Sequence, residues 1–125
     1  LNLKVHFQRF DALNWEEFKF EQKFDVIVSK PPYIPNSDKT LMHKNVLDFE
    51  PGLALFVANE SPLLFYEKIA DFALENLSES GALYFEIHER FGSETIKMLK
   101  DKGFLNVFLR QDLQGKDRML KATIN

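Results

Sequence analysis

The sequence predicts an α/β fold with a mostly parallel sheet that ends in an antiparallel strand pair. Residues 24–29, "FDVIVS", form the β-branched apolar run typical of a strand buried on both faces. Two helical patterns, at residues 63–77 and 93–102, alternate with further strand-like segments, as in a parallel sheet. The last two strand-like segments are joined by a short connection, which favours antiparallel pairing.

The first predicted element is a strand at residues 4–10, "KVHFQRF". Val5 and Phe7 alternate with His6 and Gln8, and this period of two is typical of a strand with one buried face. After the strand at residues 24–29, residues 30–62 are irregular and contain all five prolines. A segment of that length inside a compact domain indicates a functional loop.

The helix at residues 63–77 has the clearest helical pattern. Its apolar positions share one face; they are Leu64, Ile69, Phe72, Ala73 and Leu77. We expect Ser80-Gly81 to end this helix and a strand to follow at residues 82–87.

The carboxyl-terminal part completes the alternation of helices and strands. A helix is predicted at residues 93–102, where Gly103 stops it. Strands follow at residues 105–110 and 118–124, with Gly115 in the connection between them. The predicted order is therefore strand, strand, helix, strand, helix, strand, strand.

Composition excludes several classes of protein. The 125 residues suffice for one domain, and 45% of them are apolar, as in a globular protein. The net charge of −3 argues against a strongly basic nucleic-acid-binding protein. The absence of cysteine excludes disulfides and thiol nucleophiles, and no His/Asp/Glu spacing is typical of a metal site. No apolar run is long enough to span a membrane, so we expect a cytoplasmic protein.

The candidate site follows the strand at residues 24–29. In open α/β sheets, ligands bind beyond the carboxyl ends of the strands, and Lys30-Pro31-Pro32-Tyr33 occupies such an end. Prolines stiffen a turn, and each keeps a free carbonyl without a competing N–H. This turn is therefore suited to presenting hydrogen-bond acceptors to a ligand.

Five blocks resemble the HemK-like release factor glutamine methyltransferases, which are class I, Rossmann-like enzymes that depend on S-adenosylmethionine. In chain order they are "FDVIVSKPPYIP", "NVLDFEPGLALF", "LLFYEKIA", "GALYFEI" and "GKDRMLKA". The resemblance extends from about Val5 to Ala122. It implies that the chain is the carboxyl-terminal part of a methyltransferase sheet, and that its strand ending at Phe10 corresponds to the family's fourth.

The resemblance implies methyl transfer to the side-chain amide nitrogen of a glutamine in the Gly-Gly-Gln loop of peptide-chain release factors. That nitrogen is a weak nucleophile, so we expect positioning of the substrate and fixed dipoles to supply most of the rate acceleration. Pro31, Pro32 and Tyr33 match the family's motif: the Pro31 carbonyl would accept from the substrate NH2, and the Tyr33 ring would pack on the amide. Glu50 and Pro51 match the block that shapes the substrate pocket.

Position 30 departs from the family, which has asparagine there. Lysine offers no acceptor and brings a positive charge toward a cationic sulfonium, so we expect Lys30 to impair methyl transfer. For the cofactor, the resemblance assigns Asp11 and Ala12 to the adenine, and Ser29 with Lys30 to the methionine end. The family's glycine-rich cofactor loop and amino-terminal helical domain have no counterpart in residues 1–125. We therefore expect residues 1–125 to be a partial catalytic domain that binds S-adenosylmethionine weakly or not at all.

Two alternatives stay open. One is an adenine-N6 nucleic-acid methyltransferase that stacks a flipped base on Tyr33, although the acidic balance and the Phe49-Glu50-Pro51 block count against it. The other is a non-catalytic module that binds a partner such as a release factor. The expected partner is a release factor, without direct nucleic-acid or membrane contact. The exposed edge of the strand ending at Phe10 is also suited to pairing with a second copy.

Overall fold

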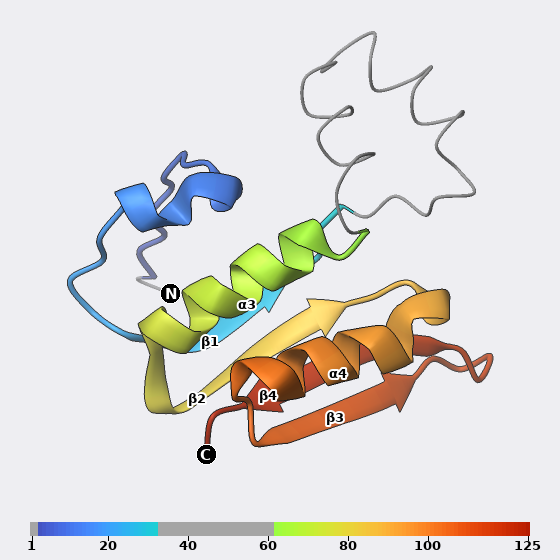
Figure 1. Ribbon diagram of the computed structural model, residues 1–125. Coiled ribbons are helices and arrows are strands. Elements are labelled where there is room, and N and C mark those ends of the chain that lie inside the picture. The colour runs from blue at the N-terminus through green and yellow to red at the C-terminus, as the bar shows by residue number, and fades with distance from the viewer. Residues whose placement is uncertain (1–2, 33–61) are drawn as a thin grey trace, which may run out of the picture.

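The computed structural model describes residues 3–32 and 62–125, which form a sheet with helices on one face (Figure 1). The described elements, in chain order, are η1 (Ala12–Glu17), β1 (Phe24–Ser29), α3 (Leu64–Asn76), β2 (Leu77–Glu86), η3 (Glu89–Phe91), α4 (Gly92–Lys102), β3 (Asn106–Gln111) and β4 (Asp117–Thr123). Within these residues, no helix has the length and apolar character needed to cross a membrane.

The sheet has the order β1-β2-β4-β3. β1 pairs with β2 in parallel, and β4 pairs antiparallel with both β2 and β3. Strands β1, β2 and β3 therefore run in one direction and β4 runs against them. This confirms the predicted α/β sheet with a terminal antiparallel pair, and it adds that the last strand is inserted beside β2.

The helices α3 and α4 lie on the same side of the sheet (Figure 1). Their inward residues meet the inward residues of the strands in one apolar core. The core residues from the strands include Leu83, Phe85, Leu120 and Ala122, and those from the helices include Tyr66, Ala70, Ala73 and Leu99. Gly103 ends α4 with a φ of 115°, a left-handed conformation that glycine adopts without strain, as predicted.

The predicted strand at residues 4–10 is wrong. Residues 3–11 contain no strand, and most of them are exposed. Alternation predicts one-sided burial, but a strand also needs a backbone partner along its length. Phe10 instead packs in an aromatic cluster, with ring centroids 5.2 Å from Phe18 and 6.2 Å from Phe72.

The predicted helix end at Ser80-Gly81 is also wrong. α3 stops at Asn76, and β2 already begins at Leu77, so Gly81 lies inside the strand. A Cβ on Gly81 would lie 2.9 Å from the Phe24 carbonyl oxygen. The glycine is therefore needed for the close approach of two strands, at a point where the register of the β1–β2 pair shifts.

Burial of residues 24–29 differs from the expectation. Ile27 packs against the core, but Val26 and Val28 are exposed on the other face of the sheet. The described residues thus cover β1 on one face only.

Candidate functional site

The candidate site lies where β1 and β2 end side by side. Ser29, the last residue of β1, is in register with Phe85, so Lys30 lies beside Glu86 at the end of β2. The Lys30 Nζ atom is 4.0 Å from Glu86 Oε1, and both side chains are largely exposed. Such an exposed pair adds little stability, but it places charges of both signs at the carboxyl edge of the sheet.

The turn after β1 has one buried and one exposed proline. Pro31 is buried and Pro32 is exposed. Ser29, Lys30, Pro31 and Pro32 thus follow one another at the predicted edge. The other predicted residues of the loop, Tyr33, Glu50 and Pro51, lie outside the described residues.

Helix α3 supports this edge through Tyr66. The Tyr66 hydroxyl donates a hydrogen bond of 2.8 Å to the Glu86 backbone carbonyl, and its ring lies 4.9 Å from that of Phe85. Sequence reasoning missed this residue because it assigned the inward face of the helix by apolar residues alone. A tyrosine next to buried positions is itself a signal, since its ring is buried readily while its hydroxyl seeks an acceptor.

A groove runs from this edge along the uncovered face of the sheet. It encloses about 530 Å³. Its lining consists of Val26, Val28, Ser29, Lys30, Tyr84, Phe85, Glu86, Met119 and Leu120. The groove is therefore apolar along the strands and polar at the edge, which is the usual composition of a ligand site.

Asp11 and Ala12 are not brought into this groove. Asp11 precedes η1 and caps it: its Oδ1 accepts from the Leu13 backbone N–H at 3.0 Å, and its Oδ2 accepts from the Asn14 side chain at 2.7 Å. A carboxylate has about four acceptor positions, so Asp11 retains acceptor capacity for an adenine amino group. The fit of these two residues to a nucleoside is therefore partial.

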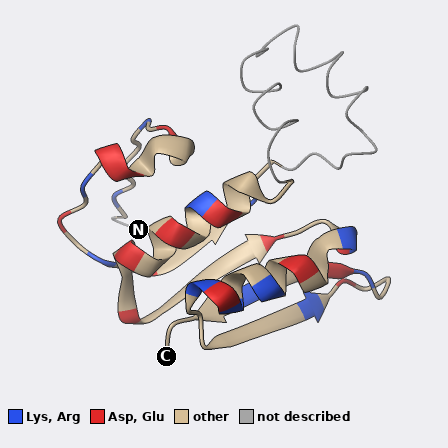
Figure 2. Cartoon of the chain, viewed as in Figure 1, with Lys and Arg blue, Asp and Glu red and all other residues tan. Residues whose placement is uncertain are grey.

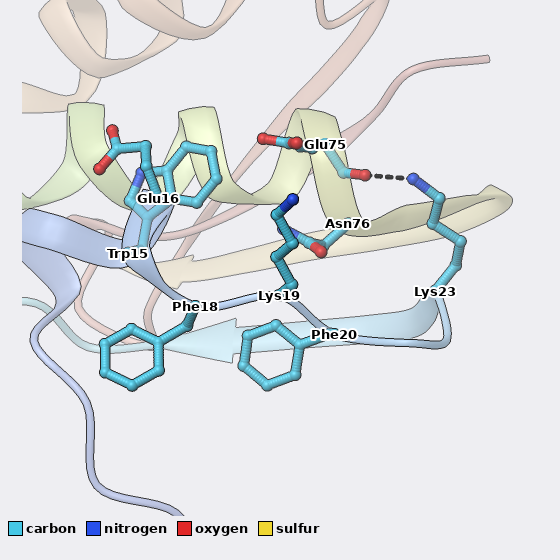
Figure 3. A pocket seen from close by; sticks show the side chains of 8 residues that line it. All are labelled: Trp15, Glu16, Phe18, Lys19, Phe20, Lys23, Glu75 and Asn76. Carbon is cyan, nitrogen blue, oxygen red and sulfur yellow. Dashed lines mark hydrogen bonds between the residues drawn. The ribbon is translucent and has the colours of Figure 1, made fainter.

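A second pocket lies at the opposite end of β1 (Figure 3). Its lining consists of Trp15, Glu16, Phe18, Lys19, Phe20, Lys23, Glu75 and Asn76. Lys23 Nζ donates to the Glu75 backbone carbonyl near the end of α3, as the dashed line in Figure 3 marks. Because Lys23 immediately precedes β1, this pocket is at the amino end of the strand, away from Pro31. It therefore does not belong to the candidate site.

Trp15, which the pocket includes, is buried as expected of a core residue. Within the part of the chain that the structure describes, its indole N–H has no hydrogen-bond acceptor. A water molecule from the pocket is a suitable acceptor, because a buried donor is costly when unpaired.

Comparison with curated proteins finds relatives that share most of the chain. The chain is 52% identical over 101 residues to the release factor glutamine methyltransferase of Flavobacterium psychrophilum, a match that covers 81% of the chain and 35% of the relative. It is 43% identical over 122 residues to that of Bacteroides thetaiotaomicron, with 98% of the chain and 44% of the relative covered. The chain thus spans less than half the length of these relatives. No protein-family profile matches it.

Comparison with solved structures supports the fold. The chain superposes with a TM-score of 0.51 on a release-factor-specific protein-(glutamine-N5) methyltransferase from Alicyclobacillus acidocaldarius, at 21% identity. The match covers 89% of the chain and 53% of that protein. At this identity the likeness concerns the fold alone.

Proposed function

Because the chain is homologous to the carboxyl-terminal portion of release factor glutamine methyltransferases, we propose that it is part of an enzyme that methylates a glutamine side-chain amide in the Gly-Gly-Gln loop of a release factor. The observation that carries the proposal is the turn Ser29-Lys30-Pro31-Pro32 at the carboxyl end of β1, beside Glu86 at the end of β2. The cytoplasm, where release factors act, is the proposed location.

The turn is proposed to orient the substrate amide. The Pro31 carbonyl accepts one N–H of the glutamine, and the ring of Tyr33, outside the described residues, packs on the amide plane. The two prolines keep the turn rigid, so that the acceptor needs no rearrangement as charge develops. Glu50 and Pro51 are proposed to line the substrate pocket.

The proposed cofactor is S-adenosylmethionine, which supplies an electrophilic methyl group when bound. Ser29 and Lys30 are assigned to its methionine end and Asp11 with Ala12 to its adenine. Since Asp11 is partly engaged in capping η1 and lines no common groove with Ser29, we expect residues 1–125 alone to bind this cofactor weakly or not at all. Isothermal titration checks this, and tight binding by the isolated chain would refute it.

Lys30 is proposed to impair the reaction. Its ammonium only donates hydrogen bonds, so it leaves the second N–H of the substrate amide without the acceptor that asparagine provides. Glu86, at 4.0 Å, offsets part of its positive charge but does not replace the acceptor. Loss of one such contact lowers a rate on the order of 10²–10³-fold.

A chimera tests the proposal. The matched region of the Flavobacterium psychrophilum relative is replaced by this chain, either unchanged or with Lys30→Asn, and transfer of labelled methyl to a release factor is measured. We expect Lys30→Asn to raise the rate about 10²-fold or more. The control Lys100→Asn removes an exposed lysine on α4 and leaves the rate unchanged. Equal rates with Lys30 and with Lys30→Asn would contradict the proposed role of position 30.

The same assay separates the alternatives. Label in DNA instead of the release factor indicates an adenine methyltransferase. The non-catalytic module is favoured by Lys30, and it predicts release-factor binding without label in any substrate, even with Lys30→Asn.

We still propose that two copies pair through a sheet edge, but at a different strand from the one expected at residues 4–10. Because residues 3–11 form no strand, β1 is itself an edge strand of the described sheet, and β3 is the edge strand on the other side. We place the pairing at β1, the edge nearer in the sequence to residues 4–10. An unpaired strand edge is a template for another chain. Sedimentation that shows only monomer up to high concentration contradicts this pairing.

A further inference from the structure

Helix α3 packs on two of its sides. Tyr66, Ala70 and Ala73 lie on the side that faces the sheet, and they belong to the apolar core. Lys68 and Phe72 are four residues apart, so they share a second side of the helix. This second side contacts η1, which lies beside α3 and away from β3 and β4 (Figure 1).

Phe72 is the centre of an aromatic cluster, which we call the η1 cluster. Its members are Phe10, Trp15, Phe18, Phe20, Phe24 and Phe72. None of the six is among the described residues that form or pack against the apolar core. The ring of Phe72 pairs with four of the others, at centroid separations of 5.6 to 6.2 Å, which are typical of favourable aromatic pairs. The η1 cluster is therefore a separate satellite of the core, and Phe72 is the member that α3 supplies.

Polar contacts between η1 and α3 contribute less to their attachment. Figure 2 shows acidic residues in η1 and charges of both signs along α3. Lys68 Nζ lies 3.4 Å from Glu16 Oε1, but the Glu16 side chain is 53% exposed. Exposed ion pairs of this kind contribute little, because water and salt screen them. The aromatic contacts of Phe72 are therefore the main attachment of η1 to the helix.

Two of these contacts flank Asp11 along the chain. Phe10 precedes Asp11, and Trp15 follows the turn in which the Asn14 backbone N–H donates to the Asp11 carbonyl at 3.0 Å. The rings of Phe10 and Trp15 both pack on Phe72, at 6.2 Å and 5.7 Å. Phe72 thus holds the turn at Asp11 from both of its ends.

The same helix also supports the carboxyl edge of the sheet. Tyr66 donates its hydrogen bond to the carbonyl of Glu86, the residue that lies beside Lys30. Tyr66 and Phe72 are separated by six helical positions, which is about 9 Å along the helix axis. A helix of this length is rigid, so α3 fixes the turn at Asp11 relative to the carboxyl edge.

We propose that Phe72 is a positioning residue for the cofactor site. Its ring holds Asp11 and Ala12 in place relative to Ser29 and Lys30, so that one molecule of S-adenosylmethionine meets both segments at once. The inference rests on the proposed function, which assigns these two segments to the adenine and to the methionine end. Phe72 acts through Asp11 and not by contact with the cofactor. Its contribution is preorganisation, because a turn that is already ordered costs less free energy to order on binding.

The first test measures backbone order in the full 125-residue chain by NMR relaxation. We expect Phe72→Ala to lower the order parameters of the Leu13 and Asn14 amides from about 0.85 to below about 0.6. The Ile87 amide, which donates a 2.8 Å hydrogen bond to β4, is expected to stay rigid. The matched control Leu74→Ala shortens an apolar side chain of the same helix that packs against the apolar core, and it is expected to leave the Leu13 and Asn14 amides unchanged.

A second variant reaches the same contact from the other side. Phe10→Ala is expected to loosen the Leu13 and Asn14 amides as Phe72→Ala does. Because Phe10 follows a segment without a strand and lies outside the apolar core, this change leaves the sheet folded, as circular dichroism verifies.

The second test measures the dissociation constant of S-adenosylmethionine by titration of the chimera described above, with Lys30→Asn. Phe72→Ala and Asp11→Ala are each expected to raise this constant about tenfold. If Phe72 acts through Asp11, the double variant binds no more weakly than the weaker single variant. A merely structural role of Phe72 gives losses that multiply, and it gives a similar loss in Leu74→Ala.

Several results overturn the proposal. They are rigid Leu13 and Asn14 amides in Phe72→Ala, losses that multiply in the double variant, and an equal loss of affinity in Leu74→Ala. Neither the order parameters nor the dissociation constant depends on methyl transfer. A chimera whose binding depends on Phe72 but which transfers no methyl group contradicts the proposed function and supports this inference. A chimera that binds no S-adenosylmethionine contradicts both.

Discussion

Removing the Tyr66 hydroxyl tests how α3 supports the carboxyl edge of β2. Tyr66 is 3% exposed, and its hydroxyl donates a 2.8 Å hydrogen bond to the Glu86 carbonyl. Tyr66→Phe retains the ring packing on Phe85 and removes the hydroxyl that donates to Glu86. A neutral hydrogen bond contributes about 1 kcal/mol net, and leaving a part-buried acceptor without this donor raises the cost toward about 2 kcal/mol.

The free energy of unfolding is measured by urea titration. We expect Tyr66→Phe to lower it by about 1–2 kcal/mol with an unchanged m-value, since the native state stays equally compact. Tyr84→Phe is the matched control: Tyr84 is exposed on the face of the sheet away from α3 and α4. Its ring is 5.9 Å from the Lys121 ammonium, and this contact survives the change. We expect less than about 0.5 kcal/mol for the control. Equal losses in both variants, or no loss in Tyr66→Phe, would refute the reasoning.

Two further predictions concern the core and a turn. Leu99→Ala, at a position that is 0% exposed, is expected to lower the free energy of unfolding by about 3 kcal/mol, whereas Leu113→Ala is expected to change it little, and the same urea titration checks both. The backbone N–H of Lys116 holds the pKa of the Asp112 carboxyl below its usual value of 3.8. The lowered pKa means that the carboxylate stabilises the β3–β4 turn above pH 3.8 and that this contribution is lost as the pH falls through the lowered pKa. The NMR shift of the Lys116 amide should therefore titrate below pH 3.8, and Asp112→Asn should abolish the titration; a midpoint at or above 3.8 contradicts the assignment.

Much of the architecture is predictable because local signals and tertiary structure agree there. The pattern at residues 63–77 and the stop at Gly103 both depend on local backbone preferences, and both elements formed. Alternation at residues 4–10 failed because a strand depends on a partner, which no local pattern specifies. The insertion of β4 beside β2 depends likewise on pairing between segments far apart in the sequence.

The candidate site was predictable in part for the same reason. The position of Lys30 and Pro31 at a sheet edge followed from the apolar run before them. The neighbour of Lys30, Glu86, and its support by Tyr66 come from another strand and a helix, so only the fold brings them together. The apolar run at residues 24–29 predicted burial on both faces, but Val26 and Val28 are exposed. A run of apolar residues marks a strand that can be covered on both faces, and it does not show whether a second covering layer is present.

The strand order has a consequence for biosynthesis. β2 and β4 are neighbours in the interior of the described sheet, yet β2 ends at Glu86 and β4 ends at Thr123. Nascent β2 therefore exposes one side of its backbone until translation has passed Thr123. Because non-local pairing is slow and leaves strand edges exposed to aggregation, a chain whose synthesis stops between these two points is at risk of misfolding. The central strand β2 therefore has its full set of backbone partners only after the last strand has been synthesised.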